Sequence, residues 1–119
     1  MMHKPHFGKV AVLMGGQSAE REISLKSGAA VLSALTAMQI EADGIDVSTD
    51  IFEQLRVGNY ARAFIALHGP FGEDGSIQGG LEVIGLPYSG SGVMASSICM
   101  NKLMTKQIWL GRQIPTPNY

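Results

Sequence analysis

Two short, wholly apolar runs interrupt a sequence in which apolar and polar residues are otherwise mixed. They are Val10–Met14 and Ala63–Leu67, and each is followed by a turn that contains glycine. Continuous runs of this kind are typical of strands that are buried on both faces of a parallel sheet. The segment Ala42–Val47 mixes apolar with acidic residues and predicts a more exposed strand, and Leu86–Tyr88 predicts a brief one.

Apolar residues at helical spacing occupy the segments between these strands. The longest series runs from Ile23 to Met38, and Ser24 is its expected N-cap. Shorter helices are predicted over Ile51–Val57, over Ser76–Ile84, from Val93 onward and over Asn101–Leu110, with Gly58, Gly85 and Gly111 closing the first, second and last of them. The alternation predicts an α/β domain, an open, mostly parallel, Rossmann-like sheet with helices on both faces.

Length and composition narrow the class of protein. With 119 residues, 45% of them hydrophobic and 16% charged, the chain has the size of one domain and enough apolar residues to fill a core. Its net charge of -1 gives no bulk attraction to nucleic acid or an anionic membrane, and no apolar run approaches the ~18 to 20 residues that span a bilayer. The single cysteine, Cys99, is expected to be a buried small hydrophobe and fits a reduced compartment. We therefore expect a cytoplasmic protein without nucleic-acid or membrane partners.

Glycine is in clear excess, with 15 in the chain, and three glycine clusters follow predicted strands. Ligands of open parallel sheets bind beyond the carboxyl ends of the strands, where these clusters lie. The first cluster, Gly15–Glu22, has neither the spacing of a dinucleotide-binding loop nor that of a P-loop. The carboxylate of Glu20 suits an ammonium or hydroxyl group on a small ligand. Pairing of Glu20 with Arg21 or with a helix terminus is the structural alternative.

The second cluster, His68–Gly75, follows the strand predicted over Ala63–Leu67. On physical grounds, His68 is either a proton donor or hydrogen-bond donor to an anion, or a structural residue that closes the loop. Glu73 and Asp74 precede a predicted helix, where carboxylates favour the positive helix end. Adjacent residues rarely aim at one point, so we expect no zinc site in this loop and a mainly structural role for the two carboxylates.

The third cluster, Ser89–Gly92, precedes a segment that carries Asn101, Lys102 and Lys106. Small residues at a helix N-terminus can hold an anion, and a nearby lysine can act as a point charge on a phosphate, although most exposed lysines do neither. Several large apolar residues of this segment are expected in a core or an interface rather than in a cofactor site, namely Met94, Met100, Met104 and Trp109.

Three stretches of the sequence together resemble the D-alanine:D-alanine ligases of the ATP-grasp superfamily. They are Val12–Leu25 with the adjoining Ser27-Gly28, the run His68–Gly79, which fits the signature H-G-x-x-G-E-D-G-x-[aliphatic]-Q-G, and Pro87–Ser91, which fits P-Y-T-G-S with serine for threonine. The resemblance extends from about Lys9 to Tyr119 and covers the N-terminal third of such a ligase. It implies a substrate-side α/β domain over residues 9–114 and a linker over residues 115–119, toward ATP-grasp domains that this sequence does not contain.

The resemblance also implies a reaction. Ligases of this family phosphorylate the carboxylate of one D-alanine with ATP and Mg²⁺, and the amine of a second D-alanine attacks the acylphosphate to give the dipeptide used in peptidoglycan. By resemblance, Glu20 holds the ammonium of the first D-alanine, His68 lies beside its carboxylate, and Ser18 is a further substrate-binding residue. Lys102 reaches the nucleotide phosphates, and the Mg²⁺ ligands belong to the absent C-terminal part.

Further expectations come with the resemblance. The family's M-D-K reads Met100-Asn101-Lys102 in this chain, so an amide replaces a carboxylate. The 119 residues alone are expected not to catalyse this reaction. Because family members are typically homodimers, a dimerisation or scaffold module is a second hypothesis. A sister ligase of the D-alanine:D-lactate type is a third, although Glu20–Leu25 looks more like the dipeptide-forming group.

Overall fold

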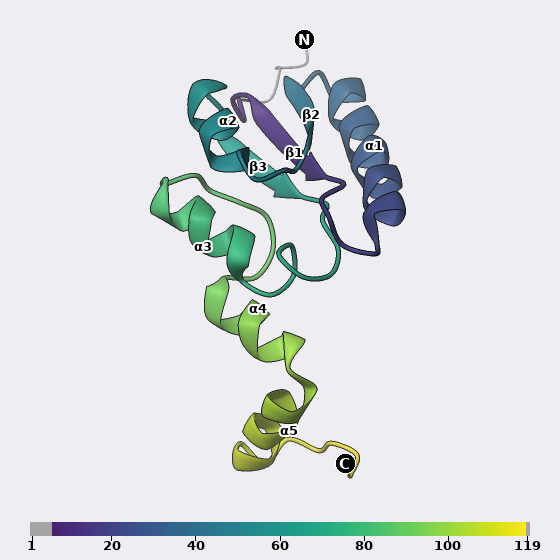
Figure 1. The fold of residues 1–119 in the computed structure, drawn as a ribbon, viewed down its shortest axis with the longest axis vertical. Coiled ribbons are helices and arrows are strands. Elements are labelled where there is room, and N and C mark those ends of the chain that lie inside the picture. Colours follow the sequence, from purple (N-terminus) through teal and green to yellow (C-terminus); the bar gives the residue numbers. More distant parts are fainter. Residues whose placement is uncertain (1–5, 119) are drawn as a thin grey trace.

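Three parallel strands form the centre of the fold, in the order β2-β1-β3 (Figure 1). They are β1 (Val10–Met14), β2 (Ala42–Asp46) and β3 (Arg62–Ile65) in a computed structural model that describes residues 6–118. β1 lies between its two neighbours and pairs with both in parallel register. The parallel sheet predicted from the apolar runs is therefore confirmed. Residues 1–5 and Tyr119, the last residue of the predicted linker, lie outside the described part.

The brief strand predicted over Leu86–Tyr88 is reduced to a bridge, between Ala63 and Tyr88. Two backbone hydrogen bonds support this bridge. Ala63 N donates to the carbonyl of Pro87, and Ser89 N donates to the carbonyl of Ala63. Because Pro87 has no N–H to donate and the chain bends at Ser89, the pairing does not extend into a strand.

The described residues form five helices, α1 (Arg21–Ala37), α2 (Ile51–Val57), α3 (Ser76–Val83), α4 (Val93–Met100) and α5 (Lys102–Gly111). α1 covers one face of the sheet, and α2 and α3 cover the other (Figure 1). This arrangement explains why β1 is apolar throughout. Val10 and Val12 belong to the cluster under α1, whereas Ala11 and Leu13 pack with α2 and α3. The predicted α/β class, with helices on both faces, is confirmed.

The start of α1 differs from the prediction. Ser24, the expected N-cap, lies inside the helix, which begins at Arg21 with Glu20 before it. The Ser24 side chain is fully buried, and its Oγ accepts a hydrogen bond from Gly15 N at 2.9 Å and donates to the carbonyl of Ala66 at 2.7 Å. The N-cap prediction is wrong because this hydroxyl satisfies backbone groups just beyond β1 and β3, rather than N–H groups of its own helix.

α4 and α5 extend away from the sheet (Figure 1). No residue of α5 is buried, and Met94, Met100, Met104 and Trp109 are 75%, 42%, 45% and 39% exposed. These side chains form no core among the described residues, and their place in an interface stays a prediction. Cys99 is also exposed, and its expected burial is wrong because α4 packs on α5 and α3 rather than on the sheet. No helix within residues 6–118 has the length and apolar character to cross a membrane.

Asn101, at the position where the resemblance leads us to expect an aspartate, is the N-cap of α5. Its Oδ1 accepts a hydrogen bond from Met104 N at 3.0 Å. Asn and Asp are equally good N-caps because either side chain offers an oxygen to the free N–H groups of the first turn. The amide therefore keeps the helix start that presents Lys102.

At the amino end of the sheet, Tyr60 lies in a small polar cluster with Asp43 and Lys9. Its hydroxyl donates to Asp43 Oδ2 at 2.8 Å, and Lys9 Nζ lies 3.4 Å from the same oxygen and 4.5 Å from the centre of the Tyr60 ring. Burial, followed by the hydrogen bond to Asp43, raises the pKa of Tyr60 to about 12. The protonated phenol is thus favoured by folding.

Replacing Tyr60 with Phe should flatten the alkaline limb of the stability profile. Because the folded pKa of Tyr60 lies above its unfolded value, its contribution is fully present below about pH 10 and is lost as the pH rises through about 12. Denaturant unfolding at about pH 9 and about pH 12 measures the effect. Wild type should lose more free energy of unfolding across that interval than Tyr60→Phe does, and equal losses would contradict the assignment.

Candidate functional site

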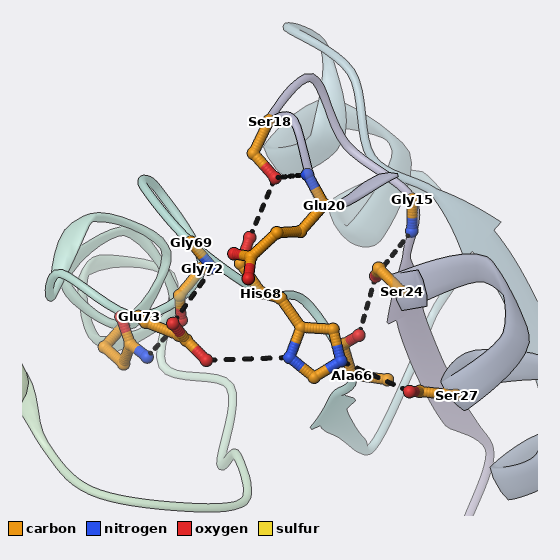
Figure 2. A network of polar contacts seen from close by, with 11 residues as sticks. Gly15, Ser18, Glu20, Ser24, Ser27, Ala66, His68, Gly69, Gly72 and Glu73 are labelled. Atoms are coloured by element: carbon orange, nitrogen blue, oxygen red, sulfur yellow. Dashed lines mark hydrogen bonds and ion pairs between the residues drawn. The ribbon is translucent and has the colours of Figure 1, made fainter. Parts of the chain in front are cut away.

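Two loops lie side by side beyond the carboxyl ends of β1 and β3 (Figure 2). The first begins with Gly15 and Gly16, whose φ angles of 75° and 78° lie in the left-handed region that favours glycine. This turn leads the loop toward the β3 side, where Ser18 Oγ donates to the carbonyl of His68 at 3.0 Å. The two glycine clusters that follow the buried strands therefore meet at one edge of the sheet, as their positions in the sequence predict.

Glu20 projects into the space between the loops without a partner of its own (Figure 2). Its backbone N donates to Ser18 Oγ at 3.1 Å, but within residues 6–118 its exposed carboxylate makes no hydrogen bond or ion pair. A Cβ added at Gly69, where φ is 75°, would lie 2.7 Å from Glu20 Oε2, so the carboxylate lies against the Gly69 backbone. Pairing of Glu20 with Arg21 is wrong, because Arg21 pairs with Asp46. The Glu20 side chain also accepts no hydrogen bond from the start of α1, where only the Glu20 backbone carbonyl accepts one, from Ser24 N.

The His68 ring is held at both of its nitrogens. Nε2 lies 3.2 Å from Ser27 Oγ, and Nδ1 lies 3.6 Å from Glu73 Oε1 (Figure 2). The other oxygen of Glu73 accepts a hydrogen bond from Gly69 N at 2.9 Å. A hydroxyl from α1 and a carboxylate from its own loop thus flank an imidazole whose side chain is 33% exposed.

Three of the four predicted site residues come together, and the fourth does not. Ser18, Glu20 and His68 lie within one network of polar contacts (Figure 2). Lys102 is the exposed first residue of α5, which lies beyond α4 and away from the sheet (Figure 1). Lys102 therefore lies outside the network that joins the other three residues.

Sequence reasoning missed two residues that lie against the His68 ring. They are Ser27 and Glu73. Ser27 follows Ser24 by three residues, so both hydroxyls lie on one face of α1. This three-residue spacing is the feature of the sequence from which the position of Ser27 could be predicted. The sequence predicts Glu73 as a helix-end carboxylate, but its Oε2 accepts a hydrogen bond from Gly69 N and its Oε1 faces the His68 ring.

Asp74 has the structural role that the sequence predicts. Its carboxylate oxygens accept from Phe71 N and Ser76 N, each at 3.0 Å, and these bonds lower the pKa of Asp74 below its ordinary value. The first bond supports Phe71, whose φ of 73° is unusual for a large side chain. Asp74 therefore shapes the loop that carries His68.

A cavity of about 400 Å³ adjoins the two loops, lined by Gly16, Gln17, Ser18, Val47, Ser48, Thr49, Pro70 and Phe71. It has room for a small molecule next to the network in Figure 2, since Ser18 belongs to both. No group of three or more His, Cys, Asp or Glu side chains within residues 6–118 is placed to hold a metal ion.

The chain is similar to known ligases over nearly its whole length. Residues 43–91 match the family model described as D-ala D-ala ligase N-terminus. Over 113 residues, the chain is 58% identical to the D-alanine–D-alanine ligase of Polaromonas naphthalenivorans and 59% identical to that of Pseudomonas fluorescens. Each match covers 95% of this chain but only 35% of the relative. The chain thus spans about a third of the length of these relatives.

Solved structures of D-alanine–D-alanine ligases are also similar to this chain. A D-alanine–D-alanine ligase from Bacillus anthracis, complexed with ATP, superimposes with a TM-score of 0.83 at 36% identity, covering 93% of this chain and 38% of that one. The ligase from Aeromonas hydrophila gives a TM-score of 0.84 at 27% identity, covering 94% of this chain and 49% of that one. Family model, sequence relatives and fold agree, and the chain belongs, as an N-terminal region, to the D-alanine–D-alanine ligase family.

Proposed function

We propose that this chain is the substrate-side region of an ATP-dependent ligase that joins two D-alanines through an acylphosphate for peptidoglycan synthesis. The observation that carries the proposal is the exposed Glu20 carboxylate, which has no partner within residues 6–118 and lies beside the His68 ring. The α-ammonium of an amino acid is the complementary group for such a carboxylate. In this proposal residues 9–114 form the substrate-side domain.

Each of the three clustered residues has a role toward the first D-alanine. Glu20 accepts charge-assisted hydrogen bonds from its ammonium. His68 lies beside its carboxylate, and one ring N–H would turn from its present neighbour, Ser27 or Glu73, to complement that negative charge. Ser18 joins the loops through the His68 carbonyl and so fixes the distance between the ammonium and carboxylate subsites.

In this proposal, most of the residues that bind ATP and Mg²⁺ lie outside this chain. Lys102, exposed at the start of α5, is a point charge suited to a nucleotide phosphate, and the Bacillus anthracis relative was solved with ATP bound. ATP supplies the phosphoryl group that activates the first carboxylate. Mg²⁺ would be held by carboxylates outside this chain. A cytoplasmic location is part of the proposal, because the reaction consumes ATP.

A second role as an association surface is favoured by the apolar side chains exposed on α4 and α5. They would pack against the remainder of a ligase or against a second copy in a homodimer. This role is compatible with the first. It becomes the whole function only if the chain assembles but adds nothing to D-alanine binding.

A hybrid ligase tests the proposal. The residues of the Polaromonas naphthalenivorans ligase that match this chain are replaced by those of this chain, and the hybrid gene is expressed in a bacterium whose own D-alanine–D-alanine ligase has been switched off. Growth without added D-alanyl-D-alanine is expected. A hybrid that accumulates as folded protein but restores no growth would contradict the proposal and leave only the association role.

A further inference from the structure

The Ser27 hydroxyl is not used by its own helix. Its Oγ lies 3.2 Å from His68 Nε2, and within residues 6–118 the His68 ring is its only hydrogen-bond partner. A serine inside a helix often donates to the carbonyl four residues earlier, and Ser24, on the preceding turn, is committed to two backbone groups. Ser27 is half-buried and has neither commitment, so its hydroxyl can rotate toward a ligand.

The other side of the His68 ring is unfavourable for an anion. Glu73 Oε1 lies 3.6 Å from Nδ1, and Glu73 Oε2 accepts a hydrogen bond from Gly69 N at 2.9 Å, so this carboxylate is held in place. A second carboxylate at Nδ1 would meet a like charge at close range. The Ser27 side of the ring offers a neutral hydroxyl instead (Figure 2). A substrate carboxylate is therefore favoured at Nε2, between the ring and α1.

Two donors can converge on a carboxylate at this position. An ionised carboxylate only accepts hydrogen bonds, whereas a hydroxyl both donates and accepts. When Nε2 carries a proton, His68 and Ser27 offer an N–H and an O–H from atoms that lie 3.2 Å apart. Paired donors of this kind bind a carboxylate through both of its oxygens, and hydrogen bonds to a charged group are stronger than those between neutral groups.

This position also adjoins the proposed ammonium subsite. Glu20 directly precedes α1, and Ser27 follows it after about two helical turns, so the two residues lie on the same side of the helix. Glu20 Oε2 lies against Gly69, the residue that follows His68. One carbon separates the ammonium and the carboxylate of an α-amino acid, so a carboxylate subsite must lie next to the ammonium subsite.

We propose that Ser27 is a substrate-binding residue, whose hydroxyl joins His68 Nε2 in holding the carboxylate of the first D-alanine. The inference rests on the proposed function, and it assigns the Ser27 side of the ring, rather than the Glu73 side, to the substrate. A serine that only positioned the ring would not touch the substrate. The two roles predict different results when a negative charge replaces the hydroxyl.

Three substitutions of Ser27 in the hybrid ligase separate the two roles, with the KM for the first D-alanine measured from phosphate release. Ser27→Ala removes the hydroxyl and should raise KM about tenfold, because a hydrogen bond to a charged group is lost. Ser27→Asn and Ser27→Asp introduce side chains of the same shape, but only the amide can donate to a carboxylate. KM should be at least about tenfold higher for Ser27→Asp than for Ser27→Asn, because two carboxylates repel each other.

Ser33→Asp is the matched control for the added charge, because Ser33 is exposed on the same helix. It should leave KM within about twofold of the unmodified hybrid. Asn and Asp have similar helix propensities, so a difference between those two variants reports the charge rather than the helix. Urea unfolding checks that each variant folds, and Ser27→Ala, with the best helix former, keeps the inference falsifiable if the polar variants do not.

Equal KM values for Ser27→Asp and Ser27→Asn would overturn the inference, because an aspartate could still hold the ring by accepting from Nε2. An unchanged KM for Ser27→Ala would overturn it as well. An unmodified hybrid without D-alanine-dependent phosphate release would instead refute the proposed function, so the two failures are distinguishable.

Discussion

Replacing Glu20 with Gln in the hybrid ligase should lower kcat/KM for D-alanine about 30- to 150-fold. The substitution keeps the size of the side chain and removes its charge, so the substrate ammonium loses a charge-assisted hydrogen bond worth about 2 to 3 kcal/mol. Because the Glu20 carboxylate makes no hydrogen bond or ion pair with other described residues, the loss of its charge should not disturb the fold. Steady-state phosphate release at varied D-alanine concentration measures the effect.

Glu22 provides the matched control, since it is an exposed carboxylate two residues away on the first turn of α1. Glu22→Gln should leave kcat/KM for D-alanine within about twofold of the unmodified hybrid, because surface charges outside a site contribute little. If Glu20→Gln and Glu22→Gln behave alike, Glu20 does not belong to the ammonium subsite.

Replacing Ser24 with Ala should destabilise the chain by about 2 to 4 kcal/mol. The hydroxyl is fully buried and joins the N–H of Gly15 to the carbonyl of Ala66, so its removal leaves two buried backbone groups without a partner. Because Gly15 begins the loop that carries Glu20, the damage falls on the substrate side of the sheet. Equilibrium unfolding of the 119-residue chain in urea measures the change.

Ser33, an exposed serine on the same helix, serves as the control for this variant. Ser33→Ala changes the same atoms without breaking a buried hydrogen bond, and should alter the free energy of unfolding by less than about 0.5 kcal/mol. Equal effects of the two substitutions would show that Ser24 does not join the strand ends.

The meeting of Ser18, Glu20 and His68 could be predicted from sequence because it depends on a simple property of parallel sheets. Apolar runs identify the buried strands, and the carboxyl ends of neighbouring parallel strands meet at one edge. Residues that follow Met14 and Ile65 must therefore lie close together. No contact between individual side chains is needed for that conclusion.

The partners of charged and hydroxyl side chains could not be predicted in the same way. Arg21 has Glu20 and Glu22 as sequence neighbours, yet it binds Asp46, because the register of β2 against β1 decides which carboxylate reaches the loop. Ser24 has the residue type of an N-cap, but its burial against the ends of two strands decides its role.

The exposure of α4 and α5 could not be predicted from the sequence, for a related reason. Residue type predicts average burial, and Cys99 and Trp109 are types that are usually at least partly buried. Whether a helix packs on the sheet depends on the path of the chain after Tyr88, and α5 lies beyond the core (Figure 1). The apolar residues there are candidates for an interface.

Kinetics of the purified hybrid ligase test whether this chain supplies the D-alanine subsite. Phosphate release in the presence of ATP and Mg²⁺ should depend on D-alanine, with a KM within about tenfold of that of the unmodified Polaromonas naphthalenivorans ligase, because 58% of the matched residues are identical. A folded hybrid that binds ATP but releases no phosphate when D-alanine is added would contradict the account.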